Sequence, residues 1–145
     1  MAEFTTQQVM KEIQEELSKT MPHLGDLYFT TFYYRKLIRL LKEQKELVLF
    51  GAGKYGIAIL AALKREGISN VRCFCDNNEK ALGKTVDELP VISPEDALEQ
   101  YPDACFVITP KDYENEILRQ LVRMGVDIES IVIFNIKNTG LIVEN

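Results

Sequence analysis

The pattern of apolar and polar residues divides the chain into two regions. Residues 1 to about 45 have the spacing of amphipathic helices, with Val9, Ile13 and Leu17 on one face of the first. From Glu46 onward, short apolar runs alternate with amphipathic segments. The pattern therefore predicts an N-terminal helical segment over residues 1–45 and a second domain over residues 46–145.

The apolar runs after residue 46 predict five strands with helices between them. Continuous apolar strands separated by helices indicate a parallel sheet covered on both faces. Right-handed crossovers favour the strand order 3-2-1-4-5. The fold class is therefore α/β, with a helical segment in front. The predicted strands are Leu47–Phe50, Val71–Cys75, Pro90–Ile92, Cys105–Thr109 and Ile131–Phe134, and the main predicted helices are 27–44, 55–65 and 112–124, with Ser93 capping and Pro94 opening another.

The first strand leads into Gly51-Ala52-Gly53-Lys54-Tyr55-Gly56, and a helix follows. A GxGxxG turn in this context, with Asp76 at the end of the next strand, is typical of a dinucleotide site. Gly51 would permit the sharp turn, Gly53 the approach of a diphosphate, and Gly56 close packing of helix on sheet. The phosphates would rest on amides at the helix start. The alternative is that the glycines only form a compact corner.

The residues assigned to the nucleotide form one set around this turn. Asp76 would accept hydrogen bonds from ribose hydroxyls and repel a 2′-phosphate, which favours NAD over NADP. Lys54 would approach a phosphate; the alternative is a solvated side chain, which is more usual for a lysine at a helix start. The full set is Gly51, Gly53, Lys54, Tyr55, Gly56, Asp76, Asn77, Thr109 and Pro110.

A family resemblance is also carried by the segments "LVLFGAGKYGIAIL", "RCFCDNN", "ALGKTVDELPVISPEDAL", "ACFVITPKDYENEILRQL" and "GVDIESIVIF". In that order they resemble the small Rossmann domains of bacterial polysaccharide and nucleotide-sugar enzymes, which accompany sugar dehydratases or epimerases, acetyltransferases and methyltransferases. The resemblance covers Leu47 to Phe134, about 60% of the chain. It implies a bound NAD or, as in the acetyltransferase relatives, a UDP-sugar, and it assigns Asn77, Thr109 and Pro110 to the crevice.

Evidence for catalysis is poor. None of the six tyrosines has a lysine four positions on, and the only histidine, His23, follows a proline in a helix break. The carboxylates Asp112, Glu114 and Glu116 are expected to be solvated. Whether the chain is an enzyme stays open. The leading hypothesis is a nucleotide-binding domain, either alone or as a fragment of a larger enzyme. The alternatives are a ligand-sensing regulatory module and an NAD-dependent oxidoreductase completed by a second subunit.

The amino-acid composition limits the classes of partner that this protein is expected to bind. The 145 residues are 46% hydrophobic and 27% charged, with a net charge of −5. The lack of a basic stripe predicts no nucleic-acid partner, and no apolar run reaches the length of a membrane span. Three cysteines in strand-like runs predict buried free thiols and no metal site, with a cytoplasmic location. Five aromatics between Tyr28 and Tyr34 suggest a homodimer contact.

Overall fold

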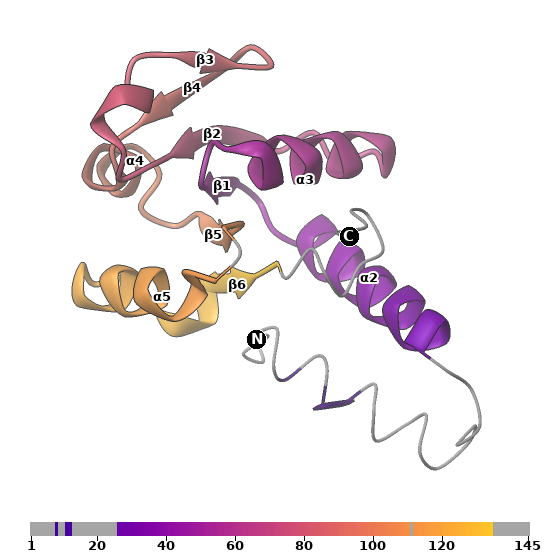
Figure 1. The fold of residues 1–145 in the computed structure, drawn as a ribbon. Coiled ribbons are helices and arrows are strands. Elements are labelled where there is room, and N and C mark those ends of the chain that lie inside the picture. The colour runs from indigo at the N-terminus through magenta and orange to yellow at the C-terminus, as the bar shows by residue number, and fades with distance from the viewer. Residues whose placement is uncertain (1–7, 9–10, 13–25, 111, 135–145) are drawn as a thin grey trace.

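The computed structural model describes residue 8 and residues 11–12, 26–110 and 112–134, and within them it forms a six-stranded sheet. The strand order is β3-β4-β2-β1-β5-β6 (Figure 1). Every pairing is parallel except that of β3 with β4. The strands are β1 (Leu47–Phe50), β2 (Val71–Cys75), β3 (Thr85–Val86), β4 (Leu89–Ile92), β5 (Cys105–Ile108) and β6 (Ile131–Ile133).

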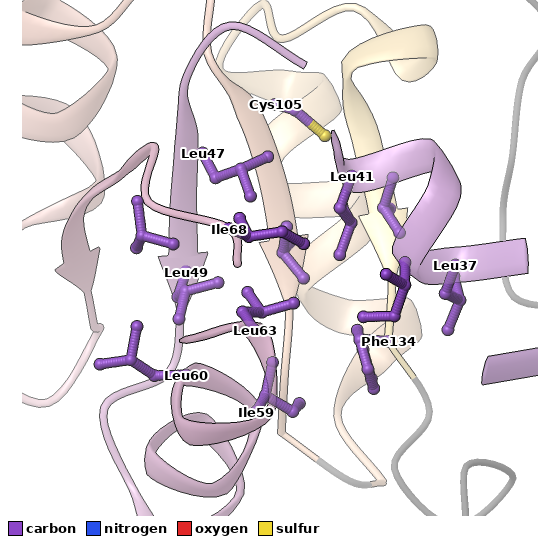
Figure 2. Close-up of a cluster of buried hydrophobic side chains, with 14 of the residues drawn as sticks. Leu37, Leu41, Leu47, Leu49, Ile59, Leu60, Leu63, Ile68, Cys105 and Phe134 are labelled. Carbon is purple, nitrogen blue, oxygen red and sulfur yellow. The ribbon is translucent and has the colours of Figure 1, made fainter. Parts of the chain in front are cut away.

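Helices cover both faces of the sheet. Helices α2 (Asp26–Lys42) and α3 (Lys54–Arg65) pack on one face, and α4 (Pro94–Gln100) and α5 (Glu114–Arg123) pack on the other (Figure 1). Side chains alternate along β1 to serve both layers. Leu47 and Leu49 join the α2–α3 layer, which Figure 2 shows, whereas Val48 and Phe50 join the α4–α5 layer. Helix α2 therefore shares a core with the sheet.

The predicted α/β fold and its five-strand parallel order are confirmed, with β4 as the third predicted strand. The structure adds one short edge strand, β3, that the sequence pattern did not indicate. It joins β4 through a two-residue turn in which Asp87 and Glu88 both have positive φ, 50° and 71°. Such turns usually contain Asn-Gly or Asp-Gly. Because Asp87-Glu88 lacks a glycine, the hairpin had no clear signal.

Helix boundaries follow local chemistry. The Ser93 hydroxyl accepts the Asp96 N–H at 3.1 Å and Pro94 opens α4, which confirms the predicted cap. Helix α5 begins at Glu114, two residues later than predicted, because Asp112 is in the left-handed region with φ 73°. The described residues also include two short 3-10 helices, η1 (Glu79–Ala81) and η2 (Ile128–Ser130).

Several predictions fall outside the described residues. They concern the first helix, the break around His23 and the tail from Asn135 to Asn145. In the aromatic stretch of α2, Tyr33 is fully buried, and the Tyr34 hydroxyl donates at 3.1 Å to Glu66, the C-cap residue of α3. The side chains of Tyr28, Phe29 and Phe32 lie outside the description. The proposed dimer contact through this stretch stays a prediction.

Candidate functional site

The turn after β1 requires glycine at two positions for structural reasons. Gly51 has a φ of 112°, and a Cβ atom there would lie 2.5 Å from the Thr109 hydroxyl oxygen. At Gly56, a Cβ atom would lie 2.0 Å from the carbonyl oxygen of Gly51 and 3.2 Å from the Phe74 ring. The fold therefore explains both glycines. Strand and helix approach each other too closely for a side chain.

Gly53 is different from its two neighbours. Its φ is −87°, which any residue adopts, and no described atom lies within 4 Å of the position a Cβ would take. Gly53 is exposed. Neither backbone strain nor crowding within the described protein calls for glycine here. The small residue leaves the space in front of the helix open to a molecule from outside.

The start of α3 presents backbone amides to this open space. Gly53 is the N-cap residue and has no side chain to cap the helix, and the first intrahelical bond runs from Ile57 N–H to the Gly53 carbonyl at 3.0 Å. The Gly53 and Lys54 amides precede that bond, so the helix ladder offers them no carbonyl four residues earlier. The first turn contains no acidic residue, and Lys54 is exposed with its Nζ 5.0 Å from the centroid of the Tyr55 ring. The helix dipole and Lys54 make this end electropositive.

Asp76 connects the end of β2 to the glycine turn. Its Oδ2 accepts the Ala52 N–H at 2.9 Å, and its Oδ1 accepts the Asn78 N–H at 2.9 Å. The carboxylate thereby fixes the turn while remaining half-buried. Each carboxylate oxygen has a second acceptor position. Asp76 can therefore hold the turn and accept hydrogen bonds from a ligand's hydroxyl groups.

A cavity of about 310 Å³ lies beside the turn, at the carboxyl ends of β1, β2 and β5 and against α5. This edge is where ligands bind in open α/β sheets. The carboxyl end of β5 contributes Pro110. Thr109 lies beneath the cavity: it is buried, and its hydroxyl donates to the carbonyls of Phe50 at 2.9 Å and Gly51 at 3.2 Å. The lining residues are Phe50, Gly51, Asp76, Asn77, Pro110, Tyr113, Glu116, Ile117 and Gln120.

The structure thus divides the residues that the sequence assigned to a nucleotide into three groups. Four line the cavity, namely Gly51, Asp76, Asn77 and Pro110. Gly53, Lys54, Tyr55 and Gly56 surround the start of α3 and do not line it. Thr109 supports the turn from below.

Sequence reasoning did not single out the residues that α5 and its N-cap contribute. Tyr113, Ile117 and Gln120 line the cavity. Glu116 also lines it, although its side chain is exposed as the sequence predicts. The predicted strand order could have indicated these residues. Strand β5 pairs with β1, so α5, which follows β5, must begin at the same edge of the sheet as the glycine turn. Its first turns therefore lie beside the glycine turn.

The thiols lie in the core and are poor nucleophiles. Cys73, Cys75 and Cys105 are buried and free, as predicted. Burial raises the pKa of Cys73 to about 11 and that of Cys105 to about 12, because the apolar surroundings disfavour the thiolate. Within the described part of the chain, no group of three His, Cys, Asp or Glu side chains could hold a metal ion. The arrangement described here is suited to binding an anionic ligand.

No helix among the described residues combines the length and the apolar character that crossing a membrane requires.

The parallel sheet with helices on both faces and a glycine turn at its ligand-binding edge defines a Rossmann-like domain. A family model described as "C2185-like, N-terminal" matches residues 43–132, which is more than half of the chain. The chain belongs to this family. No curated protein matches the sequence.

Solved structures share the fold at low sequence identity. RSP, a Rex-family repressor, matches with a TM-score of 0.53 and 18% identity over 89% of this chain and 71% of RSP. RSP in complex with β-NADH matches with a TM-score of 0.50 and 16% identity, over 92% and 86% of the two chains. UDP-D-quinovosamine 4-dehydrogenase from Vibrio fischeri matches with a TM-score of 0.49 and 18% identity, over 66% and 82%. The likeness shows a Rossmann-like fold.

The prediction that nucleic acid is excluded as a partner is wrong. RSP, which shares the fold, was also solved in complex with β-NAD+ and operator DNA; that structure matches at 16% identity and a TM-score of 0.48, over 90% and 82% of the chains. The exclusion rested on the absence of a basic stripe in the sequence. A Rossmann-like protein can bind DNA, so the overall charge of this chain does not exclude such a partner.

Proposed function

We propose that this domain binds NAD at the carboxyl edge of its sheet, with the diphosphate against the first turn of α3. The observation that carries the proposal is the open space at Gly53, for which the fold gives no reason. Uncapped amides and the positive end of the helix dipole favour an anion at that place. RSP, a protein of similar fold, binds β-NADH, which supports NAD as the nucleotide.

The described residues fit such a ligand. The Gly53 and Lys54 amides at the start of α3 would hold the diphosphate, with the Lys54 side chain beside it as a counter-charge. Asp76 would accept hydrogen bonds from the ribose hydroxyls and disfavour a 2′-phosphate. Asn77 and Pro110 would contact the nucleoside in the cavity, and Thr109 would keep the turn in place from below. NAD supplies hydride-transfer chemistry when a substrate is also present.

The role of binding in the cell is part of the proposal. The sequence resemblance to domains of nucleotide-sugar and polysaccharide enzymes favours a place in that metabolism, with a UDP-sugar as the alternative ligand. A ligand-sensing module that changes its homo-oligomeric state is the second candidate. Its basis is the density of aromatic residues from Tyr28 to Tyr34 in the sequence, and size-exclusion runs with and without NAD test it. An unchanged elution volume would remove that candidate.

A melting series tests the ligand. Thermal unfolding is measured with NAD, NADH, UDP-GlcNAc and CoA at equal concentrations. A ligand present at 100 times its dissociation constant adds about 2.7 kcal/mol to the free energy of unfolding. We expect NAD or NADH to raise the midpoint by several degrees and CoA to have no effect. A higher midpoint with UDP-GlcNAc alone would indicate that the ligand is a UDP-sugar and not NAD.

Substitution of Gly53 separates binding from folding. Gly53→Asp places a good N-cap residue at the helix start and in open space, so the midpoint without ligand should stay the same or rise slightly. Its carboxylate would occupy the position of the diphosphate and repel it, and Gly53→Val would block the same space without charge. Both variants should lose the NAD-induced rise, whereas Ser69→Val, an exposed control after α3, should keep it. Undiminished stabilisation of Gly53→Asp by NAD would contradict the proposal.

A further inference from the structure

Two side-chain amides pair across the mouth of the cavity. Asn77 follows β2, and Gln120 lies in the second turn of α5. The Asn77 Nδ2 donates to the Gln120 Oε1 at 2.7 Å, and the Gln120 Nε2 donates to the Asn77 Oδ1 at 2.8 Å. Both residues line the cavity, and their hydrogen bonds are exposed to solvent. The pair therefore links the end of β2 to α5 at this edge of the sheet.

Each of these amides offers a donor and an acceptor side by side in one plane. The edge of a nucleobase has the same pattern, which is why Asn and Gln bind adenine through two hydrogen bonds. The Asn77 amide therefore occupies the position beside Gln120 that the edge of a base could take, and the reverse holds for the Gln120 amide beside Asn77. Exchange of one planar partner for another conserves the number of hydrogen bonds, so opening the pair costs little net free energy.

The remaining walls of the cavity suit a flat ring. Tyr113 is 58% exposed although it is a large aromatic residue, and it lines the cavity from the N-cap position of α5. The left-handed residue Asp112 immediately precedes it, and strained backbone of this kind is found at ligand sites. Pro110 and Ile117 add apolar surface. Exposed aromatic rings beside polar groups are typical stacking surfaces for bases.

Size and position identify which part of a nucleotide fits. A volume of about 310 Å³ is at the lower end for ligand pockets, so it suits a nucleoside and not a whole dinucleotide. Asp76, the proposed ribose contact, lies in the same cavity as Gln120. Because the base is bonded directly to the ribose, a base attached to a ribose at Asp76 would lie within this cavity.

We propose that Gln120 recognises the donor–acceptor edge of a nucleobase, that Asn77 holds Gln120 in place before the ligand binds, and that Tyr113 stacks on the base. The inference rests on the proposed nucleotide-binding function and adds the groups that select the base. For NAD, the base is adenine, with its exocyclic amine as donor and a neighbouring ring nitrogen as acceptor. None of these contacts requires a covalent or redox step.

Calorimetric titration of NAD into a set of variants tests the proposal. Gln120→Leu removes both hydrogen-bonding groups, and we expect about tenfold weaker binding. Tyr113→Ala should weaken binding by about tenfold as well, whereas Tyr113→Phe, which keeps the ring, should bind like the wild type. Asn115→Leu is the matched control, because Asn115 is exposed on α5 and does not line the cavity. The Tyr113 and Asn115 variants should unfold at the wild-type temperature without ligand, since these side chains are exposed. Gln120→Leu also loses two hydrogen bonds to Asn77, so its midpoint without ligand should be slightly lower.

A second pair of probes isolates the base. AMP and ribose 5-phosphate share the sugar phosphate and differ only by adenine. The wild type should bind AMP more tightly than ribose 5-phosphate. In Gln120→Leu the ratio of the two dissociation constants should be closer to one. Equal binding of NAD by wild type, Gln120→Leu and Tyr113→Ala would overturn the inference.

Failure of the two proposals can be told apart. If Gly53→Asp abolishes NAD binding but Gln120→Leu does not affect it, the diphosphate site stands and the base contact falls. If the wild type binds UDP-GlcNAc instead of NAD, and Gln120→Leu weakens that binding, the base contact stands and NAD falls. If no nucleotide binds the wild type, both proposals fall.

Discussion

Gly56→Ala should destabilise the domain because the added methyl group has no space. The Cβ atom would lie 2.0 Å from the carbonyl oxygen of Gly51, and real Cβ contacts are essentially never shorter than 3.0 Å, so helix or turn must move by at least 1.0 Å, the difference of the two. The turn cannot move freely. The Gly51 N–H donates to the Cys75 carbonyl at 2.8 Å, and the Gly51 carbonyl accepts the Thr109 hydroxyl at 3.2 Å.

Two opposing effects set the size of this change. Overpacking costs about 1–3 kcal/mol, whereas alanine is favoured over glycine within a helix by about 1 kcal/mol. Because the contacting atom belongs to the backbone, we expect a net loss of about 1–2 kcal/mol, which corresponds to a midpoint roughly 3–6 °C lower for a domain of this size.

The assay is urea unfolding followed by circular dichroism, with thermal unfolding alongside. Gly53→Ser is the matched control: it adds a Cβ three residues earlier, in open space and at a position that favours serine. The control should unfold at the wild-type urea concentration or slightly above. If Gly56→Ala were as stable as wild type, the close approach of α3 to the turn would be refuted.

Further predictions concern the supports of the turn and the thiols. Thr109→Val removes a hydroxyl that donates to two backbone carbonyls, so the free energy of unfolding should fall by about 1 kcal/mol; a value equal to wild type would show that the bond contributes nothing. Asp76→Asn should reduce the preference for NAD over NADP, measured by calorimetry, because the charge that repels a 2′-phosphate is lost; an unchanged ratio would place the ribose elsewhere. Cys73 and Cys105 have raised pKa values in the folded state, about 11 and 12, so their contribution to stability is fully present below the thiol pKa of the unfolded chain, about 9, and is lost as pH rises from there through the folded values. Urea unfolding should therefore give a lower free energy of unfolding at pH 10.5 than at pH 7.5, and this difference should be smaller in Cys105→Ala. An equal difference in that variant would contradict a raised pKa of Cys105.

The sheet could be predicted because its strands are continuous apolar runs with polar and glycine-rich boundaries. Leu47–Phe50 and Cys105–Ile108 are buried along their whole length, which is the pattern that a parallel central strand requires. The edge hairpin at Thr85–Val86 could not be predicted in the same way. Its turn uses Asp87 and Glu88 in left-handed conformations, and neither residue type indicates that geometry on its own.

The candidate site shows a similar division. The glycine turn and Asp76 were visible because their roles depend on local spacing, and the structure links them by a hydrogen bond from Ala52. The pairing of Asn77 with Gln120 joins residues 43 positions apart. Such a contact depends on how α5 packs over the sheet edge, which no local pattern encodes.

The most direct test of the account is nuclear magnetic resonance of the backbone amides during titration with NAD. The account predicts that the amide signals of Gly53 and Lys54 shift strongly as the diphosphate binds at the start of α3, while Gly125 at the far end of α5 stays unchanged. NAD binding that left Gly53 and Lys54 unshifted and moved amides elsewhere would contradict a diphosphate site at this turn.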